Sequence, residues 1–175
     1  MRYSILIFSI FCVSIACTSK ADSTNDAEPI RIADLSPDSI YSEEDFDVSG
    51  VKINKSYDVS GLPMAISATR IIFDKKYVEV RLYESPDSAN NEGKTYAESV
   101  TGSDAVVSGN SVMWKEKERD RRKCVPKAGL TEAGCDQVAR YGGFIISGNL
   151  ILLCEGLDRV EAQDLCLQLI NHLDE

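Results

Sequence analysis

The sequence predicts an α+β fold in which a mostly antiparallel sheet, built from hairpins, carries two or three helices on one face and is stabilised by disulfides. Residues 77–83 alternate between apolar and polar side chains, which is typical of a half-buried strand. Residues 145–152 place apolar β-forming runs on both sides of Gly148 and Asn149, a tight hairpin signal. Residues 158–173 repeat apolar side chains along one stripe, which predicts an amphipathic helix.

Composition and charge divide the chain into four parts. We expect a signal peptide at 1–16, a flexible tether that begins with Cys17 at 17–29, an acidic and partly ordered segment at 30–50, and one globular α+β domain at 51–175. Residues 20–50 contain nine acidic and two basic residues, so much of the net charge of −9 belongs to this segment. Nucleic acid is excluded as a partner, because neutralising phosphates needs a basic surplus.

The N-terminus carries an export signal. Arg2 precedes an uncharged apolar run over residues 3–16, which suits a signal-peptide core and is too short to span a bilayer as a helix. Small residues at Ser14 and Ala16 allow a peptidase to cut before Cys17. Cleavage there would release a secreted chain, and without cleavage the apolar run would be retained as an anchor.

The tripeptide Ile15-Ala16-Cys17 resembles the lipobox of bacterial lipoproteins, although Ser14 stands where that motif usually has an aliphatic residue. The resemblance covers the first twenty residues and implies that Cys17 receives a diacylglyceryl group with fatty acyl chains such as palmitate. It implies an uncharacterised lipoprotein of the cell envelope, anchored to the extracytoplasmic side of a membrane. The body resembles no characterised family.

Two segments lead from Cys17 to the body. Residues 18–29 contain no aromatic or large aliphatic side chain and predict a flexible spacer. Residues 30–50 mix acids with apolar residues such as Tyr41 and Phe46, and we expect them to dock on the body while half-ordered.

The first part of the body is predicted element by element. Residues 51–57 suit a short strand, and residues 63–73 suit a helix with Pro63 at its first position. The strand at 77–83 follows. Ser85-Pro86-Asp87 then begins a second helix with Ser85 as its N-cap, and Gly93 interrupts it.

A repeated motif predicts a second hairpin. Residues 106–113 contain the Ser-Gly-Asn triplet that also occurs in residues 145–152, and apolar residues flank it in both places. Two hairpins give four strands, and hairpins pair their strands antiparallel.

Four cysteines in an exported domain predict two disulfides, and they permit three connectivities. The favoured pairs are local ones, Cys124 with Cys135 and Cys154 with Cys166. The second pair raises a geometric question, because a helix beginning near Asp158 places Cys166 about 12 Å along its axis, and a disulfide needs Cα atoms within about 7 Å. Either the helix packs obliquely over the strand end or the cysteines pair across the two regions.

The sequence favours no catalytic or cofactor-dependent chemistry. The only histidine is His172, near a predicted helix end, and no Gly-x-Ser-x-Gly elbow accompanies it. No phosphate-binding glycine loop is present, so we expect no cofactor. The cysteine spacing contains no Cys-x-x-Cys pair, so we expect no metal site. Paired carboxylates are too common in an acidic chain to indicate glycosidase chemistry.

The strongest candidate for binding is the run KEKERDRRK at residues 115–123, with six basic and three acidic residues. We interpret it as a site for an anionic ligand or a protein partner. Two alternatives stay open: a solvated hairpin end whose charges pair internally, and docking of the acidic segment 30–50. The candidate binding residues are Trp114, Arg119, Arg121, Arg122, Lys123 and Tyr141.

Two classes of function follow. The first is a membrane-tethered, non-catalytic binding or structural module, which a tethered domain without a catalytic constellation suits best. The second is an extracytoplasmic enzyme acting on a polysaccharide or anionic substrate. Converging carboxylates in a deep pocket would favour the enzyme, and a flat surface lined by Arg and aromatic side chains would favour the binder.

Overall fold

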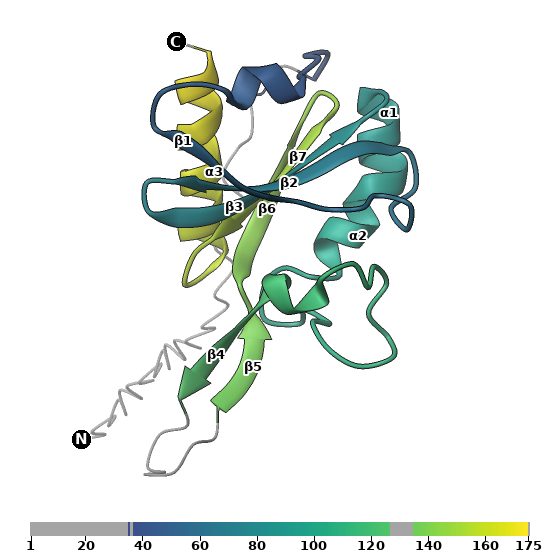
Figure 1. The fold of residues 1–175 in the computed structure, drawn as a ribbon, viewed down its shortest axis with the longest axis vertical. Helices are drawn as coiled ribbons and strands as arrows, with labels where there is room; N and C mark the ends of the chain where they lie inside the picture. The colour runs from purple at the N-terminus through teal and green to yellow at the C-terminus, as the bar shows by residue number, and fades with distance from the viewer. Residues whose placement is uncertain (1–34, 36, 127–134, 175) are drawn as a thin grey trace, which may run out of the picture.

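The computed structural model describes residues 35, 37–126 and 135–174 (Figure 1). The expected signal peptide, the lipidation site at Cys17 and the tether lie outside the described residues. The elements, in chain order, are η1 (Glu43–Phe46), β1 (Val51–Ser56), β2 (Ala65–Phe73), β3 (Lys76–Tyr83), α1 (Pro86–Ser88), η2 (Ala89–Gly93), α2 (Lys94–Glu98), η3 (Glu118–Arg121), β4 (Arg122–Pro126), β5 (Cys135–Ala139), β6 (Tyr141–Ser147), β7 (Leu150–Glu155) and α3 (Arg159–Leu173).

A five-stranded sheet forms the centre of the fold. Its strands lie in the order β1-β2-β3-β7-β6, and every neighbouring pair is antiparallel. A separate hairpin, β4–β5, extends beyond it (Figure 1). The predicted class, a mostly antiparallel α+β fold with disulfides, is confirmed.

Helix α3 and η1 cover one face of the sheet. The alternating side chains of β3 and β7 on this face, among them Val80 and Leu152, pack with Leu165 and Leu169 of α3. Asp158 caps the helix by accepting a hydrogen bond from the Glu161 N–H at 2.9 Å. Such a cap satisfies an amide that otherwise has no partner at a helix start.

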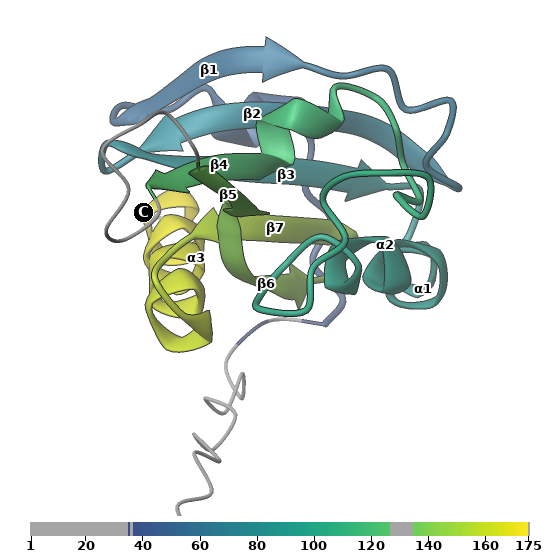
Figure 2. The same cartoon turned by 90° about the horizontal axis from the view of Figure 1, so that it is seen from below.

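The continuous segment α1–η2–α2 packs on the other face, together with the chain between α2 and β4. Figure 1 and Figure 2 show α3 and α2 on opposite sides of β6 and β7. The helices therefore occupy both faces rather than one. The reason lies in β7, whose residues 150–154 are apolar and buried on either side, a pattern typical of a strand covered on both faces.

Two local predictions are wrong. Residues 63–73, expected as a helix, contain strand β2, because side chains alternate there between Ser67, Thr69 and Ile71 on one face and Ala68 and Arg70 on the other. Partners on both sides, β1 and β3, satisfy its backbone. Residues 106–113, expected as a hairpin, belong to no named strand.

The sheet contains a hairpin that the sequence analysis did not anticipate. Strands β2 and β3 are joined through Asp74 and Lys75, whose φ angles are 45° and 62°. Positive φ at both central residues is the type I′ geometry, which usually needs Asn or Gly. The Asp-Lys sequence therefore gave little local signal. The predicted hairpin of residues 145–152 is confirmed as β6–β7.

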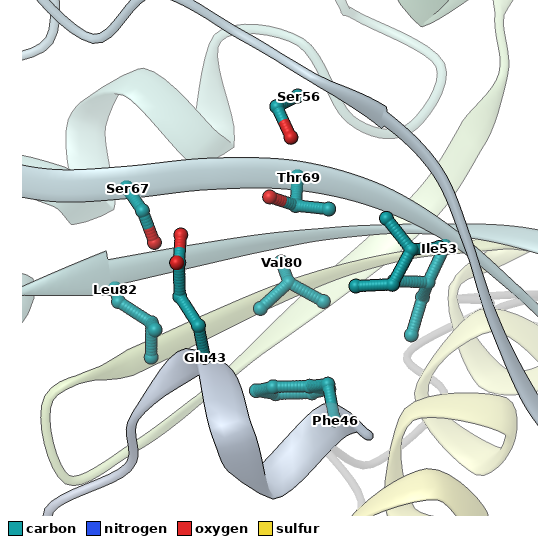
Figure 3. Close-up of a pocket in the computed structure, with 9 residues that line it drawn as sticks. Glu43, Phe46, Ile53, Ser56, Ser67, Thr69, Val80 and Leu82 are labelled. Atoms are coloured by element: carbon teal, nitrogen blue, oxygen red, sulfur yellow. The ribbon is translucent and has the colours of Figure 1, made fainter. Parts of the chain in front are cut away.

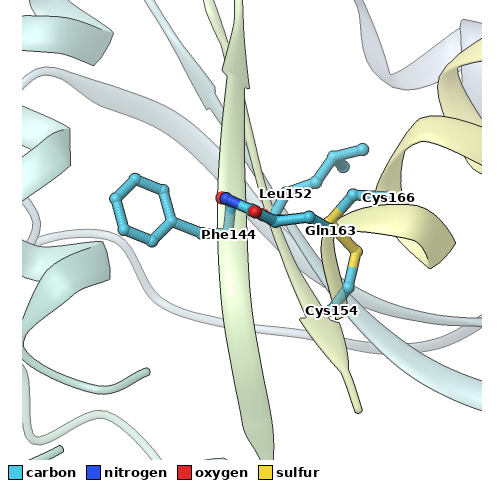
Figure 4. The surroundings of a disulfide bond; sticks show 5 residues. All are labelled: Phe144, Leu152, Cys154, Gln163 and Cys166. Carbon is cyan, nitrogen blue, oxygen red and sulfur yellow. A yellow bond between two sulfur atoms is a disulfide. The ribbon is translucent and has the colours of Figure 1, made fainter. Parts of the chain in front are cut away.

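Both favoured disulfide pairings are confirmed. Cys124 joins Cys135 across β4–β5 with 5.3 Å between their Cα atoms, and Cys154 joins Cys166 with 5.8 Å. Helix α3 packs over β6 and β7, so that Cys166 lies over the end of β7 (Figure 4). Gly156 allows this close approach, because a Cβ there would lie 2.5 Å from the Ala162 nitrogen.

The described part of the acidic segment belongs to the body. Tyr41 and Phe46 lie in the core on the α3 face, and the Tyr41 N–H donates to Asn149 Oδ1 at 2.7 Å. The Asn149 side-chain amide donates in turn to the carbonyls of Tyr41 and Tyr83. These residues dock beside the β6–β7 turn. In Figure 1 the blue segment and this turn lie at the top, whereas β4, which directly follows η3, lies at the bottom. One alternative expected the acidic segment to dock on residues 115–123. The described part of the segment does not dock there.

Candidate functional site

The structure separates the six candidate binding residues into two groups. Trp114, Arg121 and Tyr141 are buried, with exposed fractions of 3%, 1% and 0%. The remaining three, Arg119, Arg122 and Lys123, line an open depression beside the β4–β5 hairpin. Both aromatic side chains, Trp114 and Tyr141, pack in the core cluster on the sheet face opposite α3.

Arg121 is buried because it completes an ionic cluster beneath η3. Its Nε donates to Glu79 Oε1 at 3.1 Å, and its Nη1 donates to the Glu116 carbonyl at 2.7 Å. Arg81 Nε donates to the same Glu79 oxygen at 2.8 Å. The Arg121 guanidinium carbon lies 3.8 Å from the ring centroid of Trp114, a cation–π contact. The cluster fixes η3 on the sheet.

Asp120 provides a second anchor for η3. Lys55 Nζ lies 2.8 Å from its Oδ2, and Arg70 Nη1 lies 3.3 Å from its Oδ1. Burial alone would raise the pKa of Asp120, but the hydrogen bond from Lys55 and the charge of Arg70 hold that pKa below its ordinary value. With Asp120 and Arg121 directed into the protein, Arg119 and Arg122 are left to face outward.

Arg140 also lines this depression, although no motif in the sequence indicates it. It follows β5, and the β4–β5 register, which pairs Arg122 with Ala139, brings it beside Arg122. Its Nε donates to the Asp120 carbonyl at 2.9 Å and its Nη2 to the Arg122 carbonyl at 3.2 Å. A single arginine in an uncharged stretch gives no local signal, so only the strand pairing identifies it.

The basic depression is defined by Arg119, Arg122, Lys123 and Arg140, with Cys124 and Gln137 completing its lining. Among the described residues, the cations pair with two carboxylates at its margin. Arg122 Nη2 lies 3.9 Å from Glu118 Oε1, and Arg140 Nη1 lies 3.4 Å from Glu155 Oε1. Among the residues that the structure describes, no carboxylate lines the depression itself. Its chemistry suits an anion with several oxygen atoms, because guanidinium groups recognise such anions through paired N–H donors.

Other candidate chemistry in the described part of the chain is structural. His172 forms a 2.6 Å hydrogen bond with the Ser49 carbonyl and packs against Phe73. Within residues 35, 37–126 and 135–174, no group of three or more His, Cys, Asp or Glu side chains is arranged to hold a metal ion. Three further depressions each contain one carboxylate, from Glu43, Glu98 or Asp158.

The two disulfides indicate an oxidising, extracytoplasmic environment. None of the helices among the described residues is long and apolar enough to cross a membrane.

Comparison with known proteins identifies one family. No curated protein and no solved structure matches the chain. The model of a protein family described as "Family of unknown function (DUF6810)" matches residues 42–175, which begin at the N-cap of η1 and include every described strand and helix. Because the match covers well over half of the chain, the protein belongs to this family of unknown function.

Proposed function

We propose that the protein is a lipid-anchored, extracytoplasmic binding module, without catalytic activity, that receives an anionic group in its basic depression. One observation carries the proposal. Arg119, Arg122, Lys123 and Arg140 converge on one depression in a chain whose net charge is −9. Such a concentration of positive charge attracts anions although the molecule as a whole repels them.

The depression is partly preorganised for binding. The Arg140 guanidinium is oriented by two backbone carbonyls, those of Asp120 and Arg122, before any ligand arrives. The Cys124–Cys135 disulfide ties β4, which carries Arg122 and Lys123, to β5. Fixing these groups in advance reduces the entropy lost on binding. Because the site is open to solvent, we expect an affinity that falls as salt is added.

Two features support binding rather than catalysis. The depressions described above contain at most one carboxylate each, so none offers the paired acid and base of a glycosidase. In addition, His172 Nε2 is hydrogen-bonded to the backbone carbonyl of Ser49 at 2.6 Å. The alternative, an enzyme acting on a polysaccharide or anionic substrate, has no comparable observation in its favour.

The lipid anchor rests on the resemblance of Ile15-Ala16-Cys17 to a lipobox, and the two disulfides support export. The intact mass of protein extracted from membranes tests it. We expect wild-type protein to carry a diacylglyceryl mass on Cys17 and the Cys17→Ala variant to lack it. A mature wild-type chain that retains an unmodified Cys17 would contradict the anchor.

The anion site is tested by titrating the protein with inorganic pyrophosphate while recording amide signals by NMR. We expect saturable shifts at Arg122, Lys123, Gln137 and Arg140, and weaker binding at higher salt. Shifts that are absent, or that scatter over the whole surface without saturating, would contradict an anion site in the basic depression.

A further inference from the structure

A second depression lies on the α3 face of the sheet, between η1 and strands β1 to β3 (Figure 3). It contains about 390 Å³ of free space, counting the part open to solvent. The residues that line it are Glu43, Phe46, Ile53, Ser56, Ser67, Thr69, Ile71, Val80 and Leu82. We call it the η1 pocket. It shares no residue with the basic depression and does not depend on the function proposed above.

The inner lining of the η1 pocket is apolar. Phe46, Ile71, Val80 and Leu82 each expose 3% or less of their surface. Ile53 also lines the pocket but exposes 55%. A large aliphatic side chain left this open beside an apolar lining offers a surface that an alkyl group would bury.

Polar side chains surround this apolar part. They are Glu43 from η1, Ser56 from β1, and Ser67 and Thr69 from β2. Figure 3 shows the Glu43 carboxylate extending across the pocket toward the side of β2 that carries Ser67 and Thr69. Among the described residues, none of these four side chains makes a hydrogen bond or an ion pair, so all four remain available for a ligand.

Glu43 is not needed to cap η1. The capping box of this helix is made by Ser42 and Asp45, whose Oδ2 accepts hydrogen bonds from the Ser42 N–H and hydroxyl. Within the described part of the chain, Glu43 is also the only charged residue in the pocket lining. The charge of the pocket therefore comes from one carboxylate that has no structural partner in the described part of the chain.

We propose that the η1 pocket binds a small primary ammonium ion carrying a short alkyl group. The ammonium group has three donors and a positive charge, and both are matched by the Glu43 carboxylate with the hydroxyl oxygens of Ser67 and Thr69. The alkyl group packs on Phe46 and Ile53. A carboxylate ligand is repelled by Glu43, and a neutral alcohol leaves that charge unpaired.

The probe that tests this proposal is n-butylammonium, added to the protein while amide signals are followed by NMR. We expect saturable shifts at Ser67, Thr69 and Ile71, with n-butanol binding more weakly and n-butyrate not binding. Glu43→Gln should weaken n-butylammonium binding by roughly two- to fivefold, the scale of an exposed ion pair. Glu44→Gln is the matched control, because Glu44 is an exposed acid on the same helix that does not line the pocket.

Three results would overturn the proposal: no saturable shift with n-butylammonium, equal affinity for n-butanol or n-butyrate, or equal effects of Glu43→Gln and Glu44→Gln. Thr69→Val, which removes a hydroxyl at nearly constant volume, should also weaken binding. Unfolding by urea, measured for each variant, separates loss of binding from loss of folding. If a variant unfolds at the same urea concentration as the wild type and still binds n-butylammonium as tightly, the replaced residue has no role in binding.

Discussion

Arg121 of η3 and Glu79 of β3 form an ion pair that is almost wholly removed from water. The Arg121 Nε lies 3.0 Å from Glu79 Oε2, and the two side chains expose 2% and 0% of their surface. The pair joins a segment of high charge to the centre of the sheet. It explains why residues 115–123 are divided between the interior and the basic depression.

Replacing Glu79 tests this buried cluster. Glu79→Gln leaves the guanidinium groups of Arg81 and Arg121 buried without a counter-charge, and we expect a loss of about 3–5 kcal/mol in the free energy of unfolding. Urea unfolding measures it. Glu98→Gln is the control, since Glu98 is half-exposed in its 3.8 Å pair with Lys94 and should change stability by less than about 1 kcal/mol. Equal losses in the two variants would contradict the cluster's role.

The ion pairs of Asp120 should make the protein less stable in acid. Its pKa is lower when folded than the ordinary value of 3.8, so the folded state favours the carboxylate. The stability it contributes is present above that ordinary value and is lost as the pH falls through the folded pKa. At neutral pH, we expect the free energy of unfolding to be larger for the wild type than for Asp120→Asn. This difference should become smaller below about pH 4. A difference independent of pH would contradict this assignment.

The buried hydroxyl of Tyr141 should make the free energy of unfolding fall at high pH. Burial raises the pKa of its hydroxyl well above 10.0, and the charge of Glu79 raises it further. The stability linked to Tyr141 is therefore complete below pH 10.0 and declines as the pH rises beyond it.

The Tyr141 hydroxyl has no hydrogen-bond partner among the described residues. Tyr141→Phe should thus retain the stability of the wild type at neutral pH and lose less of it in alkali. Urea unfolding at a series of pH values measures both. A large destabilisation by Tyr141→Phe at neutral pH would show that the hydroxyl has a structural role.

The two disulfides should differ in their response to reductant. Cys154 and Cys166 are fully buried, whereas Cys124 is exposed at the edge of the basic depression. Because thiol–disulfide exchange requires access to a sulfur atom, we expect mild reductant to open Cys124–Cys135 first. Alkylation followed by peptide mass analysis identifies the opened pair. Opening of Cys154–Cys166 first in folded protein would contradict the burial of that disulfide.

Strong local patterns made several elements predictable. In β3, apolar side chains recur at every second residue, and in α3 they recur about every fourth residue. The β6–β7 hairpin has a Gly-Asn turn. Strand β2 was mistaken for a helix because Pro63 suggested a helix start. Its true neighbours, β1 and β3, are set by pairing that no short window contains.

The candidate site was predictable only in part. The charge run at residues 115–123 indicated Arg119, Arg122 and Lys123, which line the basic depression. The order of charges in this run did not indicate that the Arg121 side chain is buried. Its partner, Glu79, lies in β3, which is distant in the sequence. Arg140 was missed for the same reason, since only the β4–β5 pairing places it in the depression.

Binding of an anion at the basic depression is measured most directly by a comparison of two double variants. Arg119→Ala with Lys123→Ala removes two charges from the depression, whereas Lys52→Ala with Lys94→Ala removes two exposed charges elsewhere. Their affinities for inorganic pyrophosphate are compared at one ionic strength. We expect the first variant to bind at least tenfold more weakly than wild type, about 1.4 kcal/mol, and the second to bind nearly as wild type does. Equal weakening in both variants would show attraction to total charge alone and contradict a binding site at the basic depression.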